Sequence, residues 1–214
     1  MFVCVAGKND ISVNVLQTLF EKKDKNYELG IICNQNETGK DSWQKSLRFY
    51  ARKCGIREYT LQEIYQMKEL VFFSMEFDQI LKPERFIDAR FYNIHFSLLP
   101  KYRGMYTSAL PILYGEKQSG VTLHRIDRGI DTGDIIAQKV IEIGEEDTSR
   151  DLYLECIEKG TQLVIEYMDV LLKGTESAIP QEKLGATYFG RNAIDYSNLQ
   201  IDLRKTAYQI KNQI

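Results

Sequence analysis

The chain has 214 residues, of which 43% are hydrophobic and 27% are charged, a balance typical of a globular domain with one sizeable core. Its 28 basic and 30 acidic residues leave a formal net charge of -2, so no overall positive field draws it onto nucleic acid. The apolar runs are too short to span a bilayer and the start MFVCVAGKND lacks the pattern of a signal peptide, so we expect a cytoplasmic protein. The four cysteines are scattered without a C-x-x-C pair and are expected to be free thiols.

The first half of the sequence predicts alternating strands and helices. A short apolar strand at 2–7 leads through the loop GKNDIS into a helix, indicated by the apolar spacing from Val13 to Phe20. A second strand is expected at 27–33, followed by a polar loop and a helix over 42–55.

Two further apolar segments of strand length, 70–74 and 91–96, flank a short helical piece near 83–86. Strands separated by helical patterns predict a parallel sheet with crossover helices. The pattern then changes, because 119–127 and 134–143 alternate in polarity and are joined by a tight turn. This part predicts an antiparallel ribbon added to the parallel core.

The last third of the sequence predicts one long helix and a weaker tail. Residues 147–149 offer N-cap chemistry for an amphipathic helix through about Lys173, and the end of the chain, 203–214, again looks helical. We therefore expect an α/β fold with a catalytic body over 1–185. Residues 186–214 are expected to form a C-terminal extension that could begin a smaller domain.

One of the only two histidines stands at the end of a predicted strand. Side chains alternate along a strand, so Asn93, His95 and Ser97 share one face while Ile94 and Phe96 point into the core. Ligands bind at the carboxyl ends of parallel strands, where a histidine can act as a base and an asparagine amide can donate to an oxyanion. Taken alone, however, a strand histidine is more often structural than catalytic.

A carboxylate is expected close to this histidine. Asp131 lies between Gly129 and Gly133 in the turn of the ribbon, where glycines let the backbone bend sharply. Such a carboxylate could orient and polarise His95. The Arg103-Gly104 pair, just beyond the first strand, is expected to place a cation at the same mouth.

Together these motifs resemble the 10-formyltetrahydrofolate-dependent formyltransferases, which act on glycinamide ribonucleotide, methionyl-tRNA or nucleotide sugars. The matching residues are N-x-H-x-S-L-L-P at 93–100, followed by Arg103-Gly104, and H-x-x-D-x-x-x-D-T-G-D-I over 124–135. The resemblance implies a Rossmann-like fold, a metal-free reaction and a catalytic trio of Asn93, His95 and Asp131.

The resemblance also implies two binding regions. The segment after the strand at 70–74 would line a pterin pocket for 10-formyltetrahydrofolate, largely through backbone groups. The expected cofactor contacts are Ser74, Met75, Phe77, Ile80, Leu81, Asp127 and Ile130. The expected contacts of the formyl acceptor are Lys8, Asn9, Arg103, Gly104, Met105 and Tyr106.

The acceptor most in keeping with the sequence is a nucleotide-linked amino sugar, a dTDP-activated 4-amino- or 3-amino-4,6-dideoxyhexose of the kind used in surface polysaccharides such as O-antigen. A glycinamide ribonucleotide enzyme normally has a glycine-rich loop after the first strand, and this loop has a single glycine. A tRNA enzyme is expected to carry a further basic domain and an RG-x-x-P pattern, which Met105-Tyr106-Thr107 does not continue. The expected partners are therefore small molecules, with a homodimer as one expected assembly and neither nucleic acid nor a membrane.

Other interpretations remain open at this stage. A metal hydrolase would use His95, His124, Asp127 and Asp131, but their spacing is poor for metal ligation. A formyltetrahydrofolate hydrolase would use the same trio with water in place of the amine. A non-catalytic nucleotide-binding module is the third alternative. We interpret His124 as structural, although the family often has a histidine there.

Overall fold

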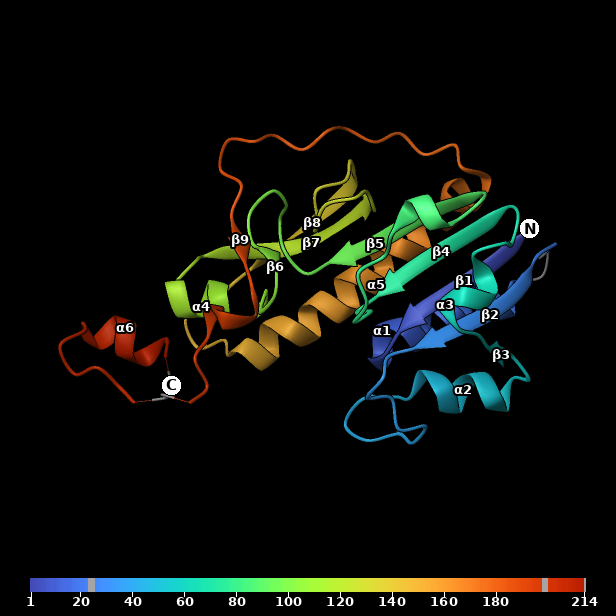
Figure 1. Ribbon diagram of the computed structural model, residues 1–214. Helices are drawn as coiled ribbons and strands as arrows, with labels where there is room; N and C mark the ends of the chain where they lie inside the picture. The colour runs from blue at the N-terminus through green and yellow to red at the C-terminus, as the bar shows by residue number, and fades with distance from the viewer. Residues whose placement is uncertain (23–25, 198–199, 214) are drawn as a thin grey trace.

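The computed structural model describes residues 1–22, 26–197 and 200–213 and contains one large sheet (Figure 1). Its strand order is β3-β2-β1-β4-β5-β7-β8. Strands β1 to β5 run parallel, whereas β7 is antiparallel to both β5 and β8. The strands span β1 Phe2–Gly7, β2 Glu28–Cys33, β3 Arg57–Glu58, β4 Leu70–Met75, β5 Ala89–His95, β7 Gln118–Arg125 and β8 Ile135–Glu142.

The helices lie on both sides of this sheet and at the C-terminal end of the chain (Figure 1). None in the described ranges has the length and apolar content needed to cross a bilayer. They span α1 Asn9–Glu21, α2 Leu47–Lys53, α3 Leu61–Ile64, α4 Leu110–Tyr114, α5 Ser149–Lys173 and α6 Ala207–Lys211, with 3-10 turns at Pro83–Arg85 and Arg191–Ala193.

The long helix α5 packs with α1 on one face of the sheet, over the larger apolar cluster of the core. It starts at a capping box in which the Thr148 hydroxyl accepts from the Asp151 N–H and the Asp151 carboxylate accepts from the Thr148 N–H. At Gly160 an added Cβ would lie 3.1 Å from the side chains of both Ile11 and Ile94. The missing side chain therefore lets α5 approach α1 and β5 closely.

The two faces of β5 pack differently. Tyr92, Ile94 and Phe96 belong to the larger cluster beside α1 and α5, whereas Phe91 packs in a smaller cluster on the opposite face. By the alternation of strand side chains, Asn93 and His95 share the face of Phe91. This agrees with the face predicted from the sequence.

The predicted α/β fold with a parallel core and an antiparallel ribbon is confirmed. The helix predicted over 42–55 is shorter, because the chain turns at Ser42 and the Ser46 hydroxyl accepts from the Phe49 N–H at the start of α2. The helix predicted over 203–214 is reduced to α6, which starts at a Thr206–Gln209 capping box. The predicted loop after β1 is replaced by a direct entry into α1 at Asn9.

A second, two-stranded sheet joins β6 (Arg103–Gly104) to β9 (Tyr188–Phe189) in parallel. No pattern in the sequence predicts this pairing. Gly104 has φ 93° and an added Cβ would lie 2.3 Å from the Phe189 carbonyl oxygen, so this close approach requires glycine. The pairing brings the segment after α5 back to the end of β5, while a domain division near residue 185 stays a prediction.

Candidate functional site

A cavity of about 840 Å³ opens at the carboxyl edge of β4 and β5. This volume lies within the range of small-molecule sites, and the carboxyl edge of a parallel sheet is where such sites form. A second hollow of about 700 Å³ lies at the opposite end of the strands, beside Met1, Leu70 and Asp88. Because this second hollow lies at the amino ends of the strands, the first cavity is the candidate site.

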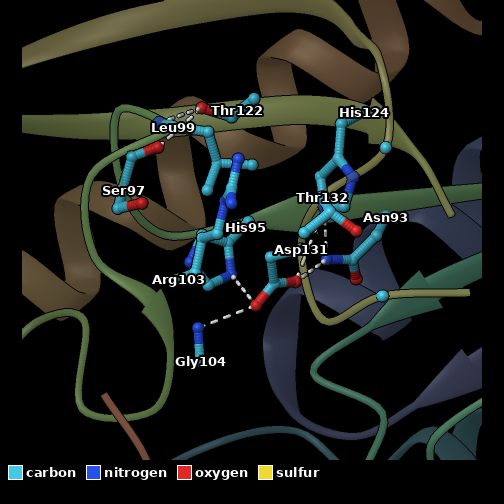
Figure 2. A network of polar contacts seen from close by, with 12 residues as sticks. Asn93, His95, Ser97, Leu99, Arg103, Gly104, Thr122, His124, Asp131 and Thr132 are labelled. Atoms are coloured by element: carbon cyan, nitrogen blue, oxygen red, sulfur yellow. Dashed lines mark hydrogen bonds and ion pairs between the residues drawn. The ribbon is translucent and has the colours of Figure 1, made fainter. Parts of the chain in front are cut away.

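Asn93, His95 and Asp131 meet in this cavity (Figure 2). Asp131 Oδ2 lies 3.5 Å from His95 Nδ1 and accepts the Gly104 N–H at 2.9 Å, and Asp131 Oδ1 lies 3.4 Å from Asn93 Nδ2. The side chains of His95 and Asp131 are only 8% and 14% exposed. Residues 38 positions apart in the sequence thus form one buried polar cluster.

The turn that carries Asp131 is held from several sides. Asp131 has a left-handed backbone with φ 53°, which costs a non-glycine residue energy unless its surroundings fix it. The Asp127 carboxylate accepts from the Gly129 N–H at 2.9 Å and the Thr132 hydroxyl at 2.6 Å. Gln181 Nε2 donates to the Asp131 carbonyl at 2.9 Å. These contacts fix the direction of the Asp131 carboxylate.

The contacts of His95 define which ring nitrogen carries a proton. Nε2 lies 2.7 Å from the Tyr102 carbonyl oxygen, which only accepts hydrogen bonds, so Nε2 bears the hydrogen. Burial lowers the pKa of His95, and the Asp131 charge and the Tyr102 carbonyl partly counter that effect. The neutral ring therefore turns the lone pair of Nδ1 toward Asp131. Any proton that arrives at Nδ1 forms an imidazolium next to a carboxylate.

Asp131 is held ionised by its surroundings. Burial by itself would raise the pKa of this carboxyl, but the electrostatic influence of the neighbouring His95 and His124 imidazoles and the hydrogen bond from the Gly104 N–H outweigh it and lower the pKa to about 2. The site thus keeps a fixed negative charge at neutral pH.

This carboxylate should make the protein sensitive to acid. The pKa of Asp131 is depressed from 3.8 to about 2, so the unfolded chain binds this proton more tightly than the folded protein does. The stabilisation, of order 2 kcal/mol, is present above about pH 4 and is lost as the pH falls through about 2. Urea unfolding of the wild type and of Asp131→Asn should therefore differ at pH 7 and converge near about pH 2. A difference that stays constant over this range would contradict the assignment.

His124 is more than the structural residue that the sequence suggested. Its Nδ1 lies 2.7 Å from the Arg125 carbonyl oxygen and therefore bears the hydrogen, which leaves Nε2 to accept from Asn93 Nδ2 at 3.0 Å. His124 Nε2 also lies 3.7 Å from Asp131 Oδ1. His124 thus positions the Asn93 amide. The residues are directly opposite in the β5–β7 pairing, a register that the sequence alone did not specify.

Most of the residues predicted to contact the cofactor line the cavity. They are Ser74, Phe77, Ile80, Leu81, Asp127 and Ile130. Ile80 and Ile130 are 71% and 40% exposed, so the cavity has solvent-exposed apolar side chains in its lining. Met75 is the exception, because its side chain is fully buried in the core. Its carbonyl is also engaged, because it accepts from the buried Ser12 hydroxyl at 2.9 Å.

The residues predicted to contact the acceptor are divided. Gly104, Met105 and Tyr106 line the cavity. The Arg103 guanidinium instead donates to Gln181 Oε1 at 2.6 Å and lies outside the lining. Lys8 serves as the N-cap residue of α1 and is also outside it.

Asn9 reaches the cavity through Glu76 and Tyr153, two residues that the sequence pattern did not indicate as part of a site. Its Nδ2 donates to Glu76 Oε2 at 2.6 Å and to the Tyr153 hydroxyl at 2.9 Å, and both partners line the cavity. Tyr188 and Arg191 are further lining residues that were not predicted. They come from the segment after residue 180, whose sequence pattern carried no signal for a site.

A metal-dependent reaction was the rival enzyme interpretation. In the part of the chain that the structure describes, no three His, Cys, Asp or Glu side chains gather as a ligand group. His95 and His124 lie near each other, but their contacts go to backbone carbonyls and to Asn93 and Asp131.

Known proteins with similar sequences and structures indicate the family of this chain. Residues 3–168 match the family described as Formyl transferase. The structure of WlaRD, a sugar 3N-formyl transferase determined with dTDP and 5-N-formyl-THF, superposes with a TM-score of 0.94 at 44% identity and covers 100% of this chain and 78% of that one. An N-formyltransferase from Helicobacter canadensis, in complex with folinic acid and dTDP-3-aminofucose, also gives 0.94, at 43% identity over 99% and 78% of the two chains. A methionyl-tRNA formyltransferase from Fervidobacterium nodosum is 29% identical over 100% of this chain and 70% of its own length.

Proposed function

This chain belongs to the formyl transferase family, and from that premise we propose that it transfers a formyl group from 10-formyltetrahydrofolate to the amine of a dTDP-linked amino sugar. The observation that carries the proposal is the meeting of Asn93, His95 and Asp131 in a cavity at the carboxyl edge of the sheet. An amide donor, an imidazole and a fixed carboxylate are the groups that acyl transfer to an amine needs.

The proposed reaction begins when the acceptor amine attacks the formyl carbon and the carbonyl oxygen becomes an oxyanion. Asn93 Nδ2 donates a hydrogen bond to that oxyanion, and its long contact of 3.4 Å to Asp131 is the one most easily exchanged for it. The nitrogen that takes the amine proton is Nδ1 of His95, because Nε2 already donates to the Tyr102 carbonyl. Asp131 stabilises the resulting imidazolium, which then protonates the departing folate nitrogen.

The proposed donor site is the apolar part of the cavity. Phe77, Leu81 and Ile130 offer apolar walls there, and Phe77 and Leu81 lie on the side of the sheet that carries Asn93 and His95. A planar pterin is held by such walls together with a few aimed polar groups. The two solved structures with the same fold and over 40% identity were determined with formylated folates, which supports the same donor here.

The proposed acceptor is a sugar with its amine at carbon 3. One of these two structures is described as a sugar 3N-formyl transferase and the other holds dTDP-3-aminofucose. Their identities of 44% and 43% exceed the 29% found with the methionyl-tRNA enzyme. The slightly negative charge of the chain also favours a small acceptor over tRNA.

A panel of acceptors tests this proposal. The purified protein is incubated with 10-formyltetrahydrofolate and, separately, with a dTDP-3-amino sugar, its 4-amino isomer, methionyl-tRNA or buffer alone. Mass spectrometry should show one added formyl group on the 3-amino sugar. Formylation of methionyl-tRNA alone, or release of formate without an acceptor, would overturn the proposal in favour of a tRNA enzyme or a hydrolase.

A further inference from the structure

Glu76 is a partly buried carboxylate that the proposed reaction does not use. It follows directly on β4 and has a left-handed backbone with φ 57°. Its Oε2 accepts from Asn9 Nδ2 at 2.6 Å and from the Tyr153 hydroxyl at 3.1 Å. Among the described residues, no group donates to its Oε1 and no cationic side chain forms an ion pair with it. One oxygen is thus fixed by the protein and the other is left without a protein partner.

The side chain of Glu76 lies beside α1 and α5, opposite the face that carries the catalytic trio. Asn9 and Tyr153 belong to those two helices, whereas Asn93 and His95 point to the other face of β5. All except Asn9 line the same cavity, which therefore wraps around the carboxyl edge of the sheet. A formyl donor bound on the face of Asn93 and His95 and a formyl acceptor bound on the face of α1 and α5 would meet at this edge.

The strand register places Glu76 close to the reacting centre. Ser74 of β4 pairs with Asn93 of β5 in parallel. Glu76 follows two residues after Ser74, just beyond the end of β4, and lines the same cavity as His95, two residues after Asn93. A sugar bound at the Glu76 carboxylate would hold its amine near the imidazole.

The fold does not need the Glu76 carboxylate to hold its loop. The Asn34 side chain already fixes the backbone there, donating to the Glu76 carbonyl at 2.8 Å and accepting from the Asp78 N–H at 3.2 Å. Burial raises the pKa of Glu76, while the Tyr153 and Asn9 hydrogen bonds and the charge of Lys8 oppose the rise. A carboxylate in such surroundings is costly unless hydrogen-bond donors satisfy it. A ligand that brings a hydroxyl group would donate a hydrogen bond to Glu76 Oε1.

We propose that Glu76 determines acceptor specificity, with Oε1 accepting a hydrogen bond from a hydroxyl group of the amino sugar. Asn9 and Tyr153 are positioning residues that hold the carboxylate in place. This assignment rests on the proposed function and adds to it the protein group that recognises the sugar.

The test separates acceptor binding from donor binding. Glu76→Gln keeps the shape but removes the charge, and it should raise KM for the dTDP-amino sugar by about 10-fold or more, the range of a hydrogen bond to a charged group. KM for 10-formyltetrahydrofolate should stay within about twofold. Tyr153→Phe removes one of the two hydrogen-bond donors to Glu76 Oε2, and it should raise KM for the sugar by a smaller factor. Thermal unfolding checks that both variants are folded.

Glu69→Gln is a matched control. Glu69 also has a left-handed backbone, with φ 50°, but it precedes β4 at the opposite end of the strand and its side chain is 72% exposed. It should leave both KM values unchanged. A sugar KM in Glu76→Gln within about twofold of the wild type, or an equal rise in both KM values, would overturn the assignment. A wild-type protein that formylates no amino sugar would instead overturn the proposed function, and this assignment with it.

Discussion

Replacing His95 by alanine is expected to lower kcat for formyl transfer by about 10² to 10⁴-fold, the range of general acid–base catalysis. The variant loses Nδ1, which in the wild type lies 3.5 Å from Asp131 Oδ2. Nδ1 is the ring nitrogen of His95 that can take a proton, because Nε2 already donates to the Tyr102 carbonyl. The rate of transfer is measured as the loss of 10-formyltetrahydrofolate in the presence of the dTDP-amino sugar.

This experiment needs evidence that the variant is folded, since His95 is buried and bonded to the Tyr102 carbonyl. Circular dichroism and thermal unfolding supply it. His95→Gln retains a side-chain donor for the Tyr102 carbonyl but provides no base near neutral pH, so it should be as inactive as the alanine variant. A folded variant of either kind with wild-type turnover would remove His95 from the proposed reaction.

Replacing Asn93 by alanine is expected to lower kcat by about 10² to 10³-fold, the typical effect of removing one oxyanion donor. Asn93 Nδ2 is oriented by His124 Nε2 at 3.0 Å, so the donor is in place before the substrates bind. The interaction forms mainly in the transition state, and KM for 10-formyltetrahydrofolate should therefore change little.

Asn14→Ala offers a matched comparison for this variant. Asn14 lies on α1 outside the cavity lining, and its side chain makes a 3.4 Å contact with Lys45 Nζ. Its removal should leave kcat unchanged. If Asn93→Ala retained wild-type kcat, or if the loss appeared wholly as a raised KM for the folate, the oxyanion role would be wrong.

Much of the fold was predictable because it depends on local patterns. The parallel core follows from the apolar strands at β1, β2, β4 and β5, and the ribbon follows from the alternation in β7 and β8. The β6–β9 pairing was not predictable, because each strand has only two residues and neither carries a periodic signal. Its formation depends on the close approach of Gly104 to Phe189, which only the folded chain specifies.

The candidate site shows the same division. The two-residue spacing of Asn93 and His95 already sets both side chains on one face of β5, since side chains alternate along a strand. The contacts of Asp131 with that face, and the role of Gln181 in holding its turn, depend on segments that meet only after folding. Arg103 was predicted to contact the acceptor because it is a cation next to the site, yet its guanidinium donates a hydrogen bond to Gln181 instead.

The sequence by itself determined the class of fold, the face of β5 that carries the chemistry and, through its motifs, the kind of reaction to expect. Only the tertiary structure decided how His124 orients Asn93, which nitrogen of His95 is free, and where the Glu76 carboxylate lies in the cavity. The physical reason is distance along the chain. Strand periodicity is set by neighbouring residues, whereas hydrogen bonds such as that between Asn9 and Glu76, 67 residues apart, exist only once the sheet has brought their elements together.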